Sequence, residues 1–181
     1  MNKPVESDLG LLQLMKEDWI AHGKDWTKPG FRAVAVYRFG VWRMKIPLLL
    51  FRAPCSMLYR MLFRFVRNVY GIELPYSIHL GRRVVFEHQH GIVIHGNASI
   101  GDDCIIRQGV TLGNRHLAAP GLAPILGKKV SVGAGAMILG KVVIGDEAWI
   151  GANAVVLQDV PSQATACGNP AVIRLKGKID E

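Results

Sequence analysis

Aliphatic residues recur every six positions through the second half of the chain. They are Ile94, Ile100, Ile106, Leu112, Leu126, Val132, Ile138, Ile144, Ile150 and Val156. Several of them are followed directly by glycine, and the corner residues are Gly, Asn or Asp, which tolerate positive φ. A period of six fits neither a helix nor a plain strand, but it suits a solenoid of short strands joined by sharp corners. The sequence therefore predicts a mainly β fold, a left-handed parallel β-helix of triangular section with three hexapeptides per coil.

The six-residue rhythm is interrupted between Leu112 and Leu126. Fourteen residues separate these sites where twelve would keep the period, so the segment at about 114–125 is predicted to bulge out as an extended loop. A loop that leaves a rigid scaffold commonly covers a functional site, whereas the alternative is a tolerated surface insertion. We favour the site-forming interpretation.

The first part of the chain has a helical pattern. Three regions are expected: a helical region at 1–70, the β-helix domain at 71–165 and a C-terminal tail at 166–181. In the first helical segment, Leu9, Leu12, Met15 and Trp19 lie at helical spacing, and Asp8 can cap its start.

A later helical segment carries three arginines on one face, Arg60, Arg64 and Arg67. The opposite face holds Met57, Leu58, Leu62 and Phe65. The simpler interpretation is a solvated cationic face over a stripe that packs on the core. The alternative is a peripheral contact with anionic lipid at the inner face of the membrane.

Composition narrows the partners and the compartment. The chain has 22 Lys and Arg against 14 Asp and Glu, which favours an anionic partner such as a phosphorylated cofactor or a membrane surface. The basic residues are scattered without a stacking aromatic pattern, so we expect no nucleic-acid partner. Cys55, Cys104 and Cys167 are odd in number and widely spaced, which favours reduced thiols in a cytoplasmic protein. The most apolar run, 46–66, is broken by arginines and a proline, so no transmembrane span is predicted.

Three histidines, His88, His90 and His95, fall in the stretch "FEHQHGIVIHG". They are candidates for metal ligands or for a catalytic base. Zinc needs three or four ligands, and no cysteine or further histidine lies at a supporting spacing. We therefore predict that no metal is required.

Four stretches together resemble the serine acetyltransferase branch of the hexapeptide acyltransferases. They are the six-residue repeat, "GFRAVAVYRFGVWRM", "EHQHGIVIH" and the ending "DVPSQATACGNPAVI", and the resemblance runs from about residue 10 to about residue 175. It implies transfer of acetyl from acetyl-CoA to a hydroxyl by direct attack. It also implies that His88, just before the "GIV" motif, is the general base, a task that suits an unperturbed pKa near 6.5.

The resemblance implies further site residues. The family places an aspartate fifteen residues before the catalytic histidine, and here that position is Glu73, the expected partner of His88. Two family aspartates bind the amino group of serine, and the matching positions are Glu87 and Asp18.

The resemblance breaks down at the acceptor carboxylate. The family holds it with an adjacent arginine and histidine in the loop, where this chain has Leu122 and Ala123. Losing a bidentate arginine removes a large share of recognition for a small zwitterion. Arg115 and His116, earlier in the loop, are the candidates to replace the pair. We therefore expect a saccharide acceptor, a surface polysaccharide or its precursor, with serine as the close alternative and a non-catalytic trimeric scaffold as a third.

For acetyl-CoA, the resemblance implies that backbone amides at small residues of the late repeats hold the pantetheine arm. The matching positions are Gly113, Ala134 and Ala152, with Asn114 at the lip, and Lys128 and Lys129 are candidates for the phosphates. Family members pack as trimers, so a homotrimer is expected, with a hexamer as the alternative.

Overall fold

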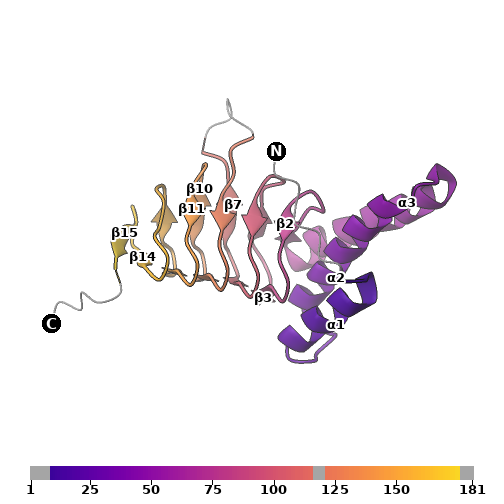
Figure 1. Cartoon of the computed structure of the whole chain (residues 1–181), viewed down its shortest axis with the longest axis horizontal. Helices are drawn as coiled ribbons and strands as arrows, with labels where there is room; N and C mark the ends of the chain where they lie inside the picture. The colour runs from indigo at the N-terminus through magenta and orange to yellow at the C-terminus, as the bar shows by residue number, and fades with distance from the viewer. Residues whose placement is uncertain (1–8, 116–120, 176–181) are drawn as a thin grey trace.

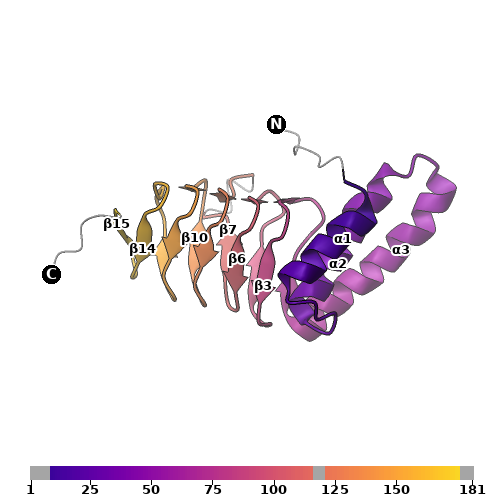
Figure 2. The ribbon, with the colours of Figure 1, turned by 60° about the horizontal axis from the view of Figure 1, so that its bottom comes forward.

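A helical region covers one end of a coiled β-structure in the computed structural model, which describes residues 9–115 and 121–175 (Figure 1). The helical elements are α1 (Leu11–Ala21), α2 (Pro29–Trp42), the short 3-10 helix η1 (Arg43–Lys45), α3 (Leu49–Phe65) and the π-helical turn η2 (Val66–Tyr70). Helix α2 packs between α1 and α3 (Figure 2). Within the described part of the chain, no helix combines the length and the apolarity needed to cross a bilayer.

Three sheets form the walls of the solenoid, and the chain visits them in turn. Sheet A contains β1 (Ile72–Glu73), β4 (Ile92–Ile94), β7 (Thr111–Gly113), β10 (Met137–Leu139) and β13 (Val155–Val156). Sheet B contains β2 (His79–Leu80), β5 (Ser99–Ile100), β8 (Ile125–Leu126) and β11 (Val143–Ile144). Sheet C contains β3 (Val85–Glu87), β6 (Ile105–Arg107), β9 (Ser131–Val132), β12 (Trp149–Ile150), β14 (Thr165–Cys167) and β15 (Val172–Arg174). All pairings are parallel except β14 with β15, which extends sheet C into the segment predicted as a tail.

The predicted parallel β-helix is confirmed, and its repeating aliphatic residues point inward. All ten residues of the six-residue repeat are at most 3% exposed. The predicted domain begins at residue 71 and so includes the first coil, but the repeat positions of this coil were not identified: Leu74, Leu80 and Phe86 are also buried at spacings of six. An eight-residue step from Phe86 to Ile94 hides this coil from a search that counts only in sixes.

The excursion between β7 and β8 is longer than the sequence count indicated. Leu112 lies on sheet A and Leu126 on sheet B, which is the next wall, so six residues would have kept the rhythm rather than twelve. The strand register agrees with this count. Ile94 pairs with Leu112, and Leu112 pairs with Ile138 in the next coil. The partners in the second pair lie eight positions further apart along the chain than the partners in the first. The insertion is therefore eight residues.

Charges of alternating sign stack along the corner between sheets B and C. We call these two columns the charge ladder: Arg82, Asp102, Lys128 and Asp146 in one, and Arg83, Asp103, Lys129 and Glu147 in the other. The ion pairs within it include Arg83 with Asp103 at 2.6 Å and Lys129 with Glu147 at 3.3 Å. The Arg83 guanidinium lowers the pKa of Asp103 through its hydrogen bonds.

The inward side of α1 differs from the apolar spacing in the sequence. Leu12 is 80% exposed, whereas Asp18 is buried. The reason is that Asp18, near the end of α1, and the buried His22 just after the helix make polar contacts with α2 and β3. Asp8, the predicted cap, lies outside the described residues, and the helix begins after Gly10, whose N–H donates to Gln13 Oε1 at 3.1 Å.

The predicted core-facing stripe of α3 is wrong at three of its four positions, and the fourth residue, Leu62, is half-buried. Met57, Leu58 and Phe65 are 66%, 48% and 50% exposed, and Tyr59 is the buried side chain of the helix. Tyr59 packs directly over Gly40 of α2, where a Cβ would clash with its ring. The helix therefore meets α2 through its Tyr59 side and turns the apolar stripe outward.

Candidate functional site

His88 lies at the corner between β3 and β4, and this corner is larger than its counterpart in the next coil. Just before the corner, Glu87 pairs with Arg107, and just after it, Val93 pairs with Thr111. The partners in the first pair lie two positions further apart along the chain than the partners in the second. Two additional residues therefore bulge from the solenoid at this corner. His88 and His90 both have positive φ, 65° and 77°, and both are exposed. The bulge presents the imidazole of His88 to solvent, where it is accessible to a substrate.

The helical region holds the bulge in place through the backbone. The His90 N–H donates to the Tyr70 carbonyl at 2.8 Å, and the His90 carbonyl accepts from the Gly109 N–H at 3.0 Å. Gly71, at φ 64°, allows this approach, because a Cβ there would lie 2.9 Å from His90 Cα. These contacts fix the corner between η2 and the next coil.

A second anchor lies on the other side of the corner. The Phe86 N–H donates to His22 Nε2 at 3.3 Å, while His22 Nδ1 bonds to the Asp18 carbonyl at 2.7 Å. Burial lowers the pKa of His22, which favours the neutral imidazole that can accept from the Phe86 N–H. Gly30, at the start of α2, packs on the Phe86 carbonyl, where any side chain would clash. Helices α1 and α2 thus position the strand that leads into His88.

Glu87 and Glu73 supply carboxylates on different elements. Glu87 forms an ion pair with Arg107 at 3.1 Å, and both side chains are about two-fifths exposed. Arg107 was not among the residues predicted from the sequence, although the eight-residue step from Phe86 to Ile94 is the signal that places it opposite Glu87. Glu73 is half-buried on β1 beside Val93 of β4, and the structure shows no hydrogen bond between Glu73 and His88. Its pairing with His88 therefore stays a prediction.

Asp18 is part of a buried structural contact. Its Oδ2 accepts from Arg38 Nε at 2.9 Å, and the two side chains are 1% and 7% exposed. Arg38 also donates to the carbonyls of Leu80 and Gly81 at 3.1 and 2.6 Å. Asp18 and Arg38 therefore form a clamp that holds the helices against the first coil. This structural role does not support the prediction that Asp18 binds an acceptor.

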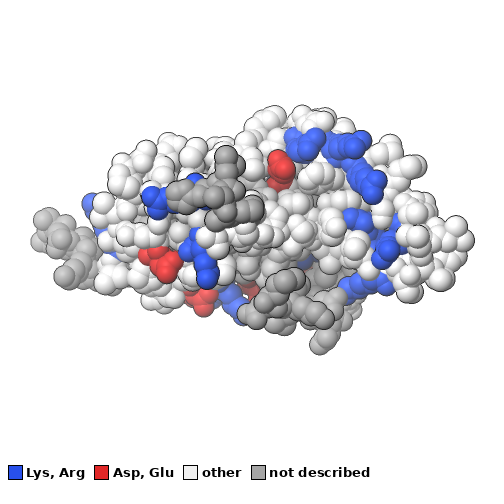
Figure 3. Space-filling model, turned by 90° about the horizontal axis from the view of Figure 1, so that it is seen from above, with Lys and Arg blue, Asp and Glu red and all other residues white. Residues whose placement is uncertain are grey.

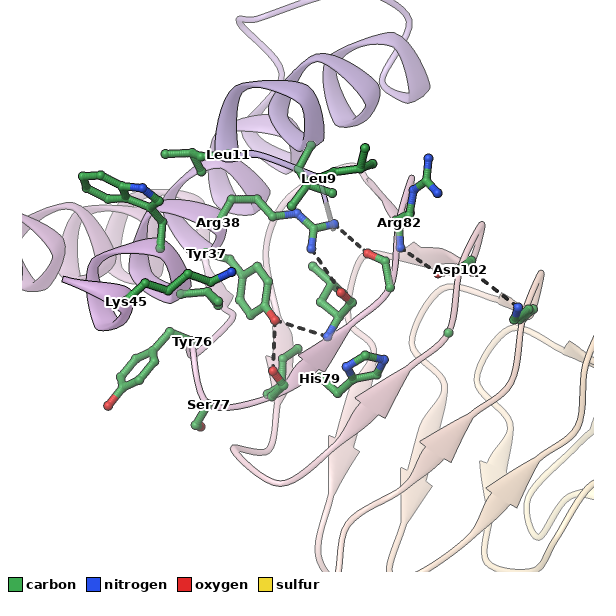
Figure 4. A pocket seen from close by; sticks show the side chains of 18 residues that line it. Leu9, Leu11, Tyr37, Arg38, Lys45, Tyr76, Ser77, His79, Arg82 and Asp102 are labelled. Carbon is green, nitrogen blue, oxygen red and sulfur yellow. Dashed lines mark hydrogen bonds and ion pairs between the residues drawn. The ribbon is translucent and has the colours of Figure 1, made fainter. Parts of the chain in front are cut away.

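A cavity of about 570 Å³ lies next to this clamp, between the helical region and sheet B (Figure 4). Leu11, Tyr37 and His79 line it, and the Tyr37 hydroxyl donates to the Ile78 carbonyl at 2.9 Å. Burial raises the pKa of Tyr37 to about 12 and lowers the pKa of His79. Neither His88 nor Glu73 lines this cavity, so it is separate from the corner that carries the candidate base.

The small residues expected to accommodate CoA fall into two groups. Ala134 and Ala152 stack along the same corner as His90, and Gly133 lets the two coils approach, because a Cβ there would lie 2.5 Å from the Ala152 nitrogen. Gln108 lies in this column, and its buried Oε1 has no hydrogen-bond partner among the described residues. Gly113 ends β7 at the opposite edge of sheet A, followed by Asn114. The corner that carries Ala134 and Ala152 can therefore accommodate a narrow, extended ligand that donates a hydrogen bond to Gln108 Oε1.

Lys128 and Lys129 lie elsewhere. Both belong to the charge ladder, at the end of β9 remote from Ala134, and their ammonium groups face Asp102 and Glu147 at 3.6 and 3.3 Å. This placement does not support a role in binding the phosphates of the same ligand.

The excursion between β7 and β8 holds the remaining candidates. Arg115 lies over the Gly140 corner, with its Cβ 3.4 Å from the position of an added Cβ at Gly140, and His116 lies outside the described residues. Leu122 is 43% exposed and Ala123 is 6% exposed. Neither of these apolar side chains can bind a carboxylate.

The three histidines of the "FEHQHGIVIHG" stretch do not converge. His88 and His90 occupy the corner before β4, whereas His95 follows β4 and accepts the Asn97 N–H through Nδ1 at 3.2 Å. Over residues 9–115 and 121–175, no three His, Cys, Asp or Glu side chains lie close enough to hold a metal ion.

The chain is similar to known proteins over most of its length, although no protein-family model matches it. It is 37% identical over 171 residues to a serine acetyltransferase of Helicobacter pylori, covering 92% of this chain and 95% of the relative. It is 38% identical over 142 residues to a serine acetyltransferase of Synechococcus elongatus, covering 78% of this chain but 55% of that longer relative.

Solved structures give the same result. Soybean serine acetyltransferase, solved in complex with serine, superposes with a TM-score of 0.77 at 31% identity, covering 91% of this chain and 69% of the other. Serine acetyltransferase from Brucella abortus, solved in complex with coenzyme A, superposes with a TM-score of 0.75 at 26% identity, covering 90% of this chain and 66% of the other. The chain therefore belongs to the serine acetyltransferase family.

Proposed function

We propose that this protein transfers the acetyl group of acetyl-CoA to the hydroxyl of serine, with His88 as the general base. The observation that carries the proposal is the bulged corner, which exposes His88 two residues before His90, where the column of Gln108, Ala134 and Ala152 begins. The relatives, named serine acetyltransferases, and the solved complexes with serine and with CoA support serine over the saccharide acceptor expected from the sequence.

The reaction needs a single proton carrier. An alcohol is a weak nucleophile near neutral pH, so the His88 imidazole takes the hydroxyl proton as the serine oxygen attacks the thioester carbonyl. The C–S bond then breaks, and the imidazolium returns the proton to the departing CoA sulfur. Products are O-acetylserine and CoA, and the histidine ends in its starting state. The small residues of the corner let the pantetheine arm lie close to the backbone.

His88→Ala tests the base. We expect kcat to fall by about 10²- to 10⁴-fold with an unchanged melting temperature, because a positioned base contributes about that much. The matched control is His95→Asn, which changes a histidine at the other end of β4. Release of free CoA is followed with a thiol reagent. A His88→Ala enzyme within tenfold of the wild type would refute the assignment.

Glu73 is proposed to orient His88 and stabilise its imidazolium. Glu73→Gln should lower kcat with little change in the KM for acetyl-CoA, since a carboxylate beside the base stabilises the imidazolium that forms during the proton transfer. Glu73→Asp should recover part of the activity. A wild-type kcat in Glu73→Gln would leave Glu73 with no role in the proton transfer.

A saccharide hydroxyl is the second candidate acceptor, because Leu122 and Ala123 cannot hold a carboxylate. An acceptor screen at fixed acetyl-CoA, with serine beside a panel of mono- and oligosaccharides, separates the two. If Arg115 replaces the missing pair, Arg115→Ala should raise the KM for serine at least about tenfold, since charged hydrogen bonds contribute roughly 1.5–3 kcal/mol. Turnover with a sugar and none with serine would transfer the proposal to the saccharide.

We also propose that the chain assembles as a homotrimer. Exposed apolar side chains lie on the outward positions of all three sheets: Val93, Ile125, Met137, Val143 and Trp149. Such walls invite lateral packing of subunits. Light scattering coupled to size-exclusion chromatography tests this directly, and a monomer at micromolar concentration would contradict it.

A further inference from the structure

The positive charge of the chain is concentrated in its helical region. Residues 26–72 contain nine Lys and Arg and no Asp or Glu, while the rest of the chain has 13 Lys and Arg against 14 Asp and Glu. The net charge of +8 therefore belongs to this one segment. On the face seen in Figure 3, Lys and Arg gather over the helical end of the molecule.

The same segment exposes large apolar side chains. Leu48, Leu49, Leu50 and Phe51, at the turn into α3, are 60% to 80% exposed. Further along α3, Met57, Met61 and Phe65 are 66%, 62% and 50% exposed. So many exposed large apolar side chains on one helix and its preceding turn are uncommon on soluble proteins and mark a contact site.

The arginines flank this apolar stripe. At 100° per residue, Met57, Met61 and Phe65 fall within one third of the helix circumference, and Arg60 and Arg64 border it on one side. The opposite third, around Tyr59, packs on α2. Among the described residues, no carboxylate pairs with Arg60 or Arg64. We call the exposed side of α3, together with its preceding turn and the exposed Arg67 in η2, the α3 surface.

We infer that the α3 surface docks on a bilayer of anionic phospholipid. The stripe is suited to the boundary between headgroups and acyl chains, and long arginines beside it can reach the phosphates. Charge complementarity selects this occupant, because a second copy of the chain would bring its own Arg60 and Arg64 against the same two exposed arginines. The helix lies on the membrane without crossing it, and the inference does not depend on the acetyl-transfer reaction.

Liposome co-sedimentation of the full chain tests the inference. We expect binding to vesicles of phosphatidylcholine mixed with anionic phosphatidylglycerol, and little binding to vesicles of phosphatidylcholine alone. The variant Arg60→Gln, Arg64→Gln, Arg67→Gln should lose on the order of 100-fold in partitioning, at about fivefold for each arginine. Higher salt should weaken the binding of the wild type.

The matched control removes three exposed cations outside the α3 surface: Lys24→Gln, Lys141→Gln and Arg174→Gln. It changes the net charge equally and should retain most of the binding. A second variant, Met57→Gln with Met61→Gln, should weaken binding while the fold, checked by circular dichroism, is kept.

Three results would overturn the inference. The first is equal binding to neutral and anionic vesicles, or none to either. The second is an equal loss in the arginine variant and its control, which would indicate net charge alone. The third is an oligomer without lipid that Met57→Gln with Met61→Gln dissociates, which would assign the surface to a second copy of the chain.

Discussion

Asp18→Asn separates a structural role for Asp18 from a role in binding the acceptor. The carboxylate is 1% exposed and meets Arg38 Nε at 2.9 Å, and its removal leaves a buried guanidinium without a counter-charge. Breaking one partner of a buried pair costs about 3–5 kcal/mol. For a chain of this size, each kcal/mol lowers the melting temperature by about 2–4 °C. The expected decrease is therefore roughly 6–20 °C.

Urea unfolding followed by circular dichroism gives the free energy of unfolding, and initial rates give the KM for serine. We expect Asp18→Asn to lose stability while the folded enzyme keeps its KM within about threefold, a change of less than about 1 kcal/mol. The control on the same helix is Glu17→Gln, which breaks the more exposed pair with Arg82 and should cost less than about 1 kcal/mol. An Asp18→Asn protein of wild-type stability whose KM rises more than tenfold would refute this structural assignment.

Three further predictions test the supports of the site. Gly30→Ala drives a methyl group into the Phe86 carbonyl, which should cost about 1–3 kcal/mol and lower kcat together with the melting temperature; an unchanged kcat would show that α2 does not position His88. Burial lowers the pKa of His22 in the folded protein, so below about pH 6.5 the unfolded chain binds a proton at this histidine more readily than the folded chain does. The stability of the fold should therefore decrease as the pH falls through this range. Thermal melts of His22→Gln should show a weaker dependence on pH. Burial raises the pKa of Cys104 to about 12, so iodoacetamide at pH 8 should modify Cys55 and Cys167 first, as peptide mass spectrometry would show; equal labelling of Cys104 would contradict its burial.

The six-residue period was sufficient to predict the solenoid because each wall of a coil needs one inward aliphatic residue and a tight corner. The repeat positions of the first coil were missed because the corner at His88 adds two residues, and this departure from the period is what exposes the candidate base. An irregular step in a regular repeat is thus a signal for a site, and both the eight-residue step from Phe86 to Ile94 and the excursion after Leu112 carry it.

The helical region was predicted less well, because periodicity shows that a helix has two faces but not which one finds a partner. The stripe around Met57 looked like a core face, yet α2 accepts the Tyr59 side through Gly40. Asp18 matched a ligand position by analogy, while its burial with Arg38 depends on contacts between separate helices. Such contacts leave no local mark in the sequence.

The charge ladder limits how this solenoid can change its length. Its signs alternate from coil to coil, so the loss of the coil that carries Asp102 and Asp103 would bring Arg82 and Arg83 against Lys128 and Lys129. The duplication of a single coil would likewise place two rows of equal charge in contact, and like charges at that spacing repel. Removal or insertion of two consecutive coils would restore the alternation. We therefore expect descendants of this chain to lengthen or shorten by pairs of coils more readily than by one.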